Sequence, residues 1–146
     1  MLKIALIADE LTHASLKAED GVIIKNLTPL NYKLVFYFWK PDFLFVESAW
    51  HGFKNKWKYK IASYPDYPKR NNNQLKKLIS YAKKNNIPTV FWNKEDHVHF
   101  DRFIESAKLF DFIFTVDENC ILKYKSYARE NSFVGILPFA VQSKFH

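Results

Sequence analysis

The chain has 146 residues, a formal net charge of +7 and an apolar share of 48%. That length is typical of one domain with its own buried core, and the apolar share excludes an intrinsically disordered chain. The single cysteine, Cys120, excludes an internal disulfide and favours a reducing compartment.

The first half of the chain predicts three short strands, over residues 3–8, 22–25 and 43–46. A helix capped by Asp9 or Thr12 joins the first two strands and ends at Gly21. Residues 28–40 fit either a helix or a strand, because their apolar spacing is helical but their aromatic residues are dense. Pro41 ends this segment in both cases.

A long loop rich in Lys and Tyr follows, over residues 50–73, with room for one irregular helical turn. The second half then predicts three more strands, over residues 88–92, 111–115 and 133–137. Apolar residues at helical spacing predict helices over about residues 73–85, 100–107 and 117–129. The alternation predicts an α/β, Rossmann-like domain over residues 1–137: an open, mostly parallel sheet of about six strands with helices on both faces.

Polar side chains follow four of these strands, where the carboxyl ends of parallel strands form one edge of the sheet. Ligands of open α/β sheets bind at that edge, so the sequence predicts a small-molecule site there. The candidate residues are Asp9, Glu10, His13, Glu47, Ser48, Trp50, Asn93, Glu95, Asp96, His97 and Asp117.

Several of these residues have a structural interpretation as well as a functional one. Asp96 or Glu95 can accept a proton from an attacking hydroxyl group, or can cap the following helix. Glu47 and Trp50 can bind a sugar, or can be a buried carboxylate and a core indole. Asp117 is favoured as a helix cap.

The chain lacks the sequence signals of a nucleotide or metal site. It has three glycines, and no glycine-rich loop follows the first strand, where Asp9 and Glu10 would repel a phosphate. No spacing of Cys and His indicates zinc, and His97 and His99 are favoured as surface or site histidines. We therefore expect no cofactor and no metal in this domain.

The charge is unevenly distributed. Ten basic residues stand against Asp66 in a basic belt: Lys54, Lys56, Lys58, Lys60, Lys69, Arg70, Lys76, Lys77, Lys83 and Lys84. Residues 93–118 carry an acidic excess. This pattern indicates attraction to an anionic partner, or a solvated face that keeps the protein in solution.

Four segments carry a resemblance to a known family. They are residues 40–52 (KPDFLFVESAWHG), 90–100 (VFWNKEDHVHF), 107–117 (AKLFDFIFTVD) and 137–142 (LPFAVQ). Together they resemble the N-terminal half of the CgeB-like glycosyltransferases, two-domain enzymes of bacterial surface-polysaccharide and spore-coat clusters. One departure is His97, where that pattern leads us to expect a proline. The other is length, because residues 138–146 would be only the start of the interdomain linker.

The resemblance implies the GT-B architecture of two facing Rossmann-like domains. This chain would be the acceptor-side half, with Asp96 and Glu95 as its catalytic residues. The nucleotide-sugar donor would bind a C-terminal domain that is absent here, so this chain alone should be nearly inactive. The acceptor would be a glycan or a lipid-linked glycan.

We expect a cytoplasmic protein, because no secretory signal precedes the first strand and the longest apolar run, residues 34–39, is too short to span a bilayer. The basic belt allows peripheral contact with the inner membrane face. The alternative function is a standalone basic module that binds nucleic acid or an anionic surface. It depends on Trp57, Tyr59, Tyr64 and Tyr67 among the lysines, although nucleic acid is the less favoured partner.

Overall fold

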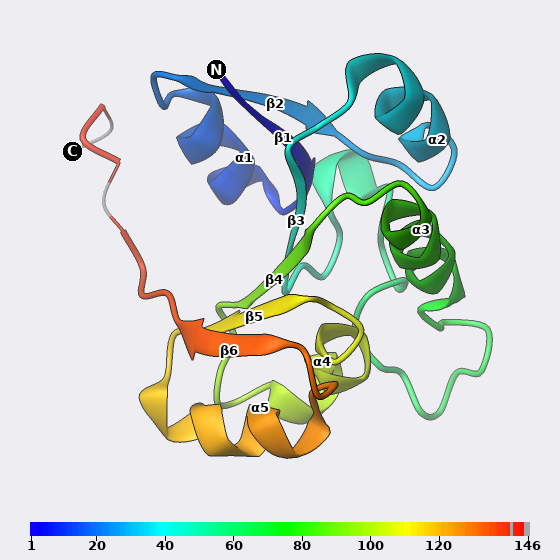
Figure 1. Cartoon of the computed structure of the whole chain (residues 1–146). Coiled ribbons are helices and arrows are strands. Elements are labelled where there is room, and N and C mark those ends of the chain that lie inside the picture. Colours follow the sequence, from blue (N-terminus) through cyan, green and yellow to red (C-terminus); the bar gives the residue numbers. More distant parts are fainter. Residues whose placement is uncertain (141, 145–146) are drawn as a thin grey trace.

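The structure is a computed structural model that describes residues 1–140 and 142–144. Within these residues, six strands form one parallel sheet in the order β2-β1-β3-β4-β5-β6 (Figure 1). The strands are β1 (Leu2–Ile7), β2 (Val22–Asn26), β3 (Phe43–Glu47), β4 (Thr89–Asn93), β5 (Phe112–Thr115) and β6 (Phe133–Ile136). The predicted Rossmann-like α/β fold is confirmed.

Helices connect successive strands. The α-helices are α1 (Glu10–Lys17), α2 (Tyr32–Leu34), α3 (Asn73–Lys84), α4 (Phe100–Ala107) and α5 (Ile121–Tyr127). A π-helical turn, Val35–Trp39, continues α2, so the ambiguous segment is helical. The reason is tertiary, because Tyr32 and Phe36 pack their rings against Tyr81 of α3. Short 3₁₀ turns lie at Phe53–Asn55 and Glu118–Cys120.

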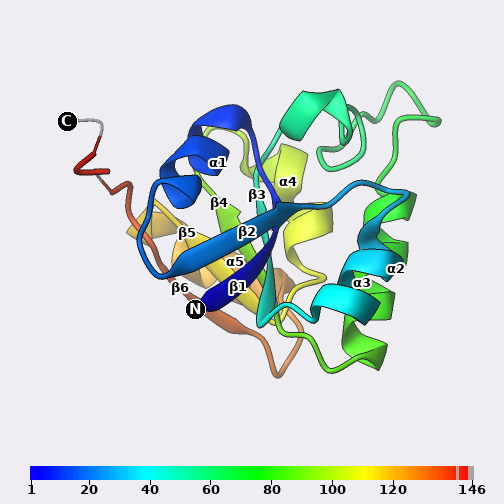
Figure 2. The same ribbon diagram turned by 90° about the horizontal axis from the view of Figure 1, so that it is seen from above.

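The helices lie on both faces of the sheet, but unequally. Figure 2 shows α1 on one side and α2 and α3 on the other. Buried residues of α2 to α5 join alternate strand residues in one hydrophobic core; the strand members are Ala5, Ile7, Leu44, Val46, Phe91 and Ile113. Helices α4 and α5 meet where the ring of Phe100 contacts Tyr124, at 4.7 Å between centroids. Four of the five described helices therefore share one face.

The opposite face of β3 to β6 carries aromatic residues that are only partly covered. Phe45 and Trp92 contact one another there, and Phe133 of β6 is more than half exposed. The chain after β6 returns over this face: the carbonyl of Leu137 accepts a hydrogen bond from Trp92 Nε1 at 2.8 Å, and Phe139 contacts the same indole. Residues 138–140 and 142–144, where we expected a linker to begin, contain no helix or strand.

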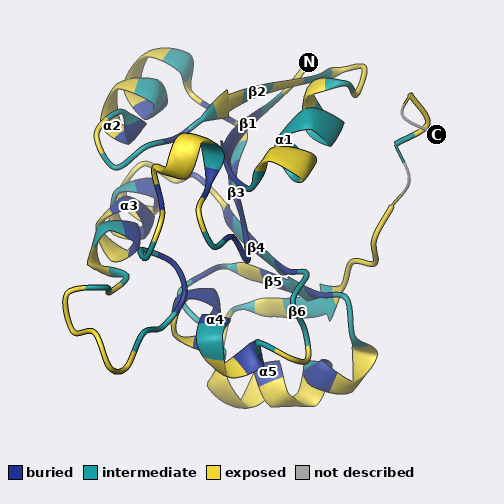
Figure 3. Ribbon diagram, turned by 180° about the vertical axis from the view of Figure 1, so that it is seen from behind, coloured by how far each residue is buried: buried dark blue, intermediate teal, exposed yellow. Residues whose placement is uncertain are grey.

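The long loop is folded against the body of the domain rather than extended into solvent. Its one 3₁₀ turn matches the predicted irregular turn. Trp57 is 1% exposed and donates its indole N–H to the carbonyl of Leu27 at 2.8 Å. Ile61 is also buried, and its carbonyl accepts a hydrogen bond from Ser106 Oγ at 2.6 Å. In Figure 3 dark blue marks buried residues, and parts of this loop are buried in the same way as β3 and β4.

Replacement of Trp57 by alanine tests how far the loop depends on this anchor. We expect Trp57→Ala to lower the free energy of unfolding by about 3–5 kcal/mol, because it removes a buried ring and leaves a cavity. Urea denaturation followed by circular dichroism measures this loss. Lys58→Ala, at the exposed neighbouring position, is the control and should change stability by less than about 0.5 kcal/mol. A loss below about 1 kcal/mol for Trp57→Ala would contradict the anchoring role.

Candidate functional site

The strand order reverses at β1, whose neighbours are β2 and β3. In open α/β sheets, ligands usually bind in the crevice at such a switch point, outside the carboxyl ends of the strands. Here Glu47, the last residue of β3, occupies this position and is fully buried. The side chain of Glu47 therefore occupies the switch point itself.

Three groups surround the Glu47 carboxylate. Its Oε1 accepts hydrogen bonds from the backbone N–H of Asp9 at 2.7 Å and from Lys94 Nζ at 3.2 Å, and its Oε2 accepts one from Thr12 Oγ1 at 2.6 Å. Burial raises the pKa of Glu47, while Lys94 and the hydrogen bonds oppose that shift. With no exposed surface, Glu47 fits the structural interpretation better than contact with a substrate.

Asp9 lies at the N-cap position of α1 but does not cap it. Its Oδ1 instead accepts a hydrogen bond from the backbone N–H of Gly52 at 2.9 Å. The predicted caps, Asp9 and Thr12, are both wrong, because each side chain is engaged across the β1–β3 junction. Gly52 has φ +71°, and a Cβ there would lie 3.0 Å from Trp57 Cβ, so this turn requires glycine.

Ser48 and Trp50 are also held inside the fold. Ser48 is buried, and its Oγ accepts a hydrogen bond from the backbone N–H of Lys94 at 3.0 Å. Trp50 packs edge-on against Phe103 and His99, with ring centroids 4.8 and 5.1 Å away. Both residues support the sheet edge, and the geometry favours the core interpretation of the indole.

The predicted residues on α1, Glu10 and His13, have their own neighbours. His13 stacks on Phe53, and its Nδ1 is 3.1 Å from Asn26 Oδ1. Glu10 is exposed in the first turn of α1 and lines a small hollow of about 250 Å³ with Asp9. Neither residue reaches the polar cluster beyond β4 and β5.

That cluster is centred on Asp96. Its Oδ2 accepts hydrogen bonds from Thr115 Oγ1 at 2.5 Å and from Tyr124 Oη at 2.7 Å. The Tyr124 hydroxyl in turn accepts a hydrogen bond from Asn93 Nδ2 at 2.8 Å. Oδ1 of Asp96 is buried and has no hydrogen-bond partner among the described residues. The interpretation of Asp96 or Glu95 as a cap is wrong, because His99 holds the N-cap position of α4.

His97 and Asp117 form an exposed pair beside Asp96. The Nδ1 of His97 is 3.0 Å from Oδ2 of Asp117, and the His97 side chain is 77% exposed. Asp117 Oδ1 also accepts a hydrogen bond from the backbone N–H of Asn119 at 2.9 Å, which confirms the predicted cap. Asp117 thus has a structural partner and a second oxygen directed at His97.

The environment shifts the pKa values of the two aspartates in opposite directions. Burial raises the pKa of Asp96, against the hydrogen bonds from Thr115 and Tyr124. The backbone N–H of Asn119 lowers the pKa of Asp117, and His97 acts in the same direction. An ionised Asp117 can only accept a hydrogen bond, so in the neutral form of His97 the proton lies on Nδ1 and Nε2 carries the lone pair. Adjacent acids with diverging pKa values are typical of acid–base sites.

A hollow of about 530 Å³ opens beside the two aspartates, and His97 borders it through its contact with Asp117 rather than as a lining residue. Its lining residues are Asp96, Val116, Asp117, Glu118, Asn119 and Ile136. The structure therefore brings together Asn93, Asp96, His97 and Asp117 from the predicted set, with Glu95 on the same turn. Sequence reasoning missed Thr115 and Tyr124. Thr115 is the last residue of β5, so its position at a strand end could have placed it among the candidates. No sequence pattern around Tyr124 indicates that it reaches this site.

Comparison with protein-family models, curated proteins and solved structures found no match. Within residues 1–140 and 142–144, no helix combines the length and apolar character needed to cross a membrane. The same residues contain no group of three or more His, Cys, Asp or Glu side chains placed to hold a metal ion.

The ion pair between Glu47 and Lys94 makes the free energy of unfolding depend on pH. We expect Lys94→Met to cost about 3 kcal/mol at pH 8, because it leaves the Glu47 carboxylate buried without its cation. The pKa of Glu47 is higher in the folded protein than in the unfolded chain. The free energy of unfolding therefore falls as pH rises through the range between the two pKa values, because the carboxyl group ionises more readily in the unfolded chain. Near pH 4 the folded carboxyl is protonated and the unfolded one is mostly so, and the variant should cost much less than at pH 8.

Urea denaturation of both proteins at pH 4 and pH 8 measures the difference. Glu47→Gln combined with Lys94→Met is the control, because it removes the carboxylate and should flatten the pH dependence. Equal losses for Lys94→Met at both pH values would show that the ion pair is not the cause.

Proposed function

We propose that this chain is the acceptor-side domain of a GT-B glycosyltransferase that builds a bacterial surface glycan. The observation that carries the proposal is the His97–Asp117 pair, which lies with Asp96 at the carboxyl edge of β4 and β5 beside an open hollow. The absence of a glycine-rich phosphate loop and the four family-like segments support it.

The geometry favours His97 as the group that activates the acceptor. The free oxygen of Asp96 is buried, and its other oxygen already accepts two hydrogen bonds. The His97 side chain is 77% exposed, so Nε2 of its neutral imidazole can take up a proton, and the Asp117 carboxylate at Nδ1 stabilises the imidazolium that forms. Asp96 would then have a structural role, because its hydrogen bonds with Thr115 and Tyr124 hold the base of the site in place. Glu95 is the second candidate base.

The proposed reaction is one displacement at the donor sugar. The acceptor hydroxyl oxygen forms a bond to the anomeric carbon, and its proton passes to Nε2 of His97. The bond from that carbon to the nucleotide phosphate breaks, and the phosphate leaves with the electron pair. In this scheme a second domain holds the donor, and the protein works at the cytoplasmic face of the membrane, where lipid-linked acceptors are available.

The alternative, a nucleic-acid module, has less support from the geometry. Trp57 is buried and unavailable for stacking. The faces of Tyr59 and Tyr67 are occupied by Arg70, whose guanidinium carbon lies 3.9 and 4.2 Å from the two ring centroids. Tyr67 remains 54% exposed, but one face of each ring is covered by Arg70, so fewer aromatic faces are open to base stacking than the sequence indicates.

The native protein should be larger than this domain. We expect an immunoblot of source cells, using an antibody against this chain, to show a band well above 17.4 kDa, because a donor-binding domain must accompany it. A purified sample of this chain marks the position of the isolated domain on the same gel. A single band at that position would oppose the two-domain proposal.

Replacement of His97 tests the chemical step in the native, full-length protein. We expect His97→Gln to lower kcat by about 10²–10⁴-fold, because the amide cannot take up the proton. Transfer of labelled sugar from nucleotide-sugar donors to cell-surface glycan measures this loss. His51→Gln, at an exposed histidine of the same sheet edge, should retain activity. Asp117→Asn should also lower kcat and change its pH profile.

Glu95→Gln separates the two candidate bases. If Glu95→Gln abolishes transfer while His97→Gln retains it, then Glu95 is the base and His97 is not.

A further inference from the structure

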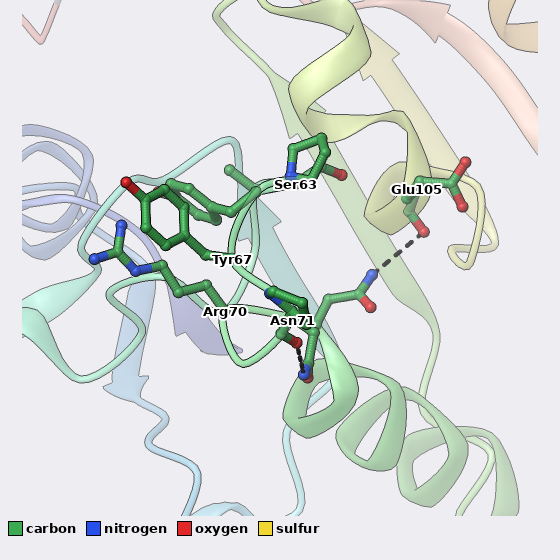
Figure 4. Close-up of a pocket in the computed structure, with 10 residues that line it drawn as sticks. Ser63, Tyr67, Arg70, Asn71 and Glu105 are labelled. Atoms are coloured by element: carbon green, nitrogen blue, oxygen red, sulfur yellow. Dashed lines mark hydrogen bonds between the residues drawn. The ribbon is translucent and has the colours of Figure 1, made fainter.

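A second hollow lies away from the His97–Asp117 pair, between the second half of the long loop, residues 62–72, and Glu105 of α4. It has a volume of about 390 Å³. Figure 4 shows Arg70 beside Tyr67 on one side of it and Glu105 on the other. The lining residues include Ser63, Tyr64, Tyr67, Arg70, Asn71 and Asn72.

The walls of this hollow are fixed by hydrogen bonds to α4. The backbone N–H of Ser63 donates to the carbonyl of Arg102 at 2.6 Å, and Arg102 Nε donates to the carbonyl of Ser63 at 2.8 Å. Asn72 Nδ2 donates to Ser106 Oγ at 3.0 Å. Polar groups on these walls are therefore held in place before any ligand arrives.

Arg70 is placed by its aromatic neighbours. Its guanidinium lies over the rings of Tyr59 and Tyr67, with Tyr64 further away at 5.8 Å, and its backbone N–H donates to the carbonyl of Tyr67 at 2.8 Å. Stacking fixes the plane of the guanidinium and leaves its N–H groups at the edge. No residue in the described part of the chain accepts a hydrogen bond from the Arg70 side chain or forms an ion pair with it.

The charge around the hollow favours an anion. Lys69 lies between the lining residues Pro68 and Arg70 in the chain, and Lys58 Nζ lies 5.0 Å from the Tyr59 ring, on which Arg70 stacks. The carboxylate on the wall, Glu105, is paired with Lys108 at 2.6 Å. An arginine with free, coplanar donors binds two oxygens of a carboxylate or phosphate at once. The tyrosine rings beside it offer apolar surface to the carbon skeleton that carries such a group.

We propose that this hollow, called here the Arg70 site, binds an oxyanion, a carboxylate or a phosphate, on the glycan acceptor. The site gives the proposed transferase a preference for acidic acceptors, and in that respect the inference rests on the proposed function. Arg70 is the specificity-determining residue, whereas the lysines add only general attraction.

Binding to the whole 146-residue chain tests the Arg70 site without any sugar transfer. The probes are glucuronate, inorganic phosphate and neutral glucose, and the readout is the ¹⁵N-resolved Nε–H signal of Arg70 by NMR. We expect a saturable shift with at least one anion and none with glucose. A tighter response to glucuronate assigns an acidic sugar, and a tighter response to phosphate assigns a phosphorylated one.

Matched variants separate specific recognition from general charge. Arg70→Met should weaken anion binding by about tenfold or more, because two charge-assisted hydrogen bonds are lost. Lys69→Met removes the same charge from the adjacent position and should weaken it less than about twofold. Arg70→Lys keeps the charge but loses the paired donors, so it should resemble Arg70→Met. It also serves as the test if the methionine variant fails to fold.

Three outcomes would overturn the proposal: no saturable shift with either anion, equal losses in Lys69→Met and Arg70→Met, or tighter binding of a short single-stranded oligonucleotide than of both anions. The experiment measures anion binding and not sugar transfer. If no anion binds, the proposed transferase could still act on a neutral acceptor. Conversely, loss of the transferase proposal would leave the anion site standing.

Discussion

The arrangement of the sheet edge depends on the buried carboxylate of Glu47. A charge with no access to water must be matched by hydrogen bonds and a counter-ion, and Glu47 obtains them from three different parts of the chain. The backbone after β1, the first turn of α1 and Lys94 after β4 all meet there. One side chain thus fixes the relative positions of the elements on which the polar residues stand.

This arrangement moves the candidate chemistry away from the switch point. With Glu47 buried between the ends of β1 and β3, the hollow that remains there is about 250 Å³, and the larger polar hollow of about 530 Å³ lies beyond β4 and β5. There the chain separates two aspartates by environment, one enclosed and one exposed beside a histidine. The same residue type thus occupies two different environments: Asp96 is held by hydrogen bonds to Thr115 and Tyr124, and Asp117 contacts His97.

Much of the fold could be predicted from the sequence because its signals are local. The apolar runs and the helical spacing of Leu75, Leu78 and Ile79 depend on neighbours in the chain, and they placed the strands and α3 to within a few residues. The hydrogen-bond partners of Asp9 and Thr12 could not be predicted, since they come from residues about 35–43 positions away. The helical form of residues 32–39 likewise depends on Tyr81.

The candidate site was predictable in its location but not in its roles. Position after a strand selected Asp96, His97 and Asp117 together. Which of them is enclosed depends on Tyr124, whose hydroxyl reaches Asp96 from 28 positions further along the chain. No local pattern around Asp96 indicates that contact.

The return of the chain over the sheet has an optical consequence. Trp92 is held by the carbonyl of Leu137 and the ring of Phe139, whereas Trp57 is enclosed under the long loop. The two indoles therefore report on different events. Release of the C-terminal segment exposes Trp92 to water and red-shifts its emission while Trp57 stays unchanged. With Trp39 and Trp50 replaced by phenylalanine, the fluorescence of the two remaining indoles can distinguish loss of that segment from unfolding of the domain.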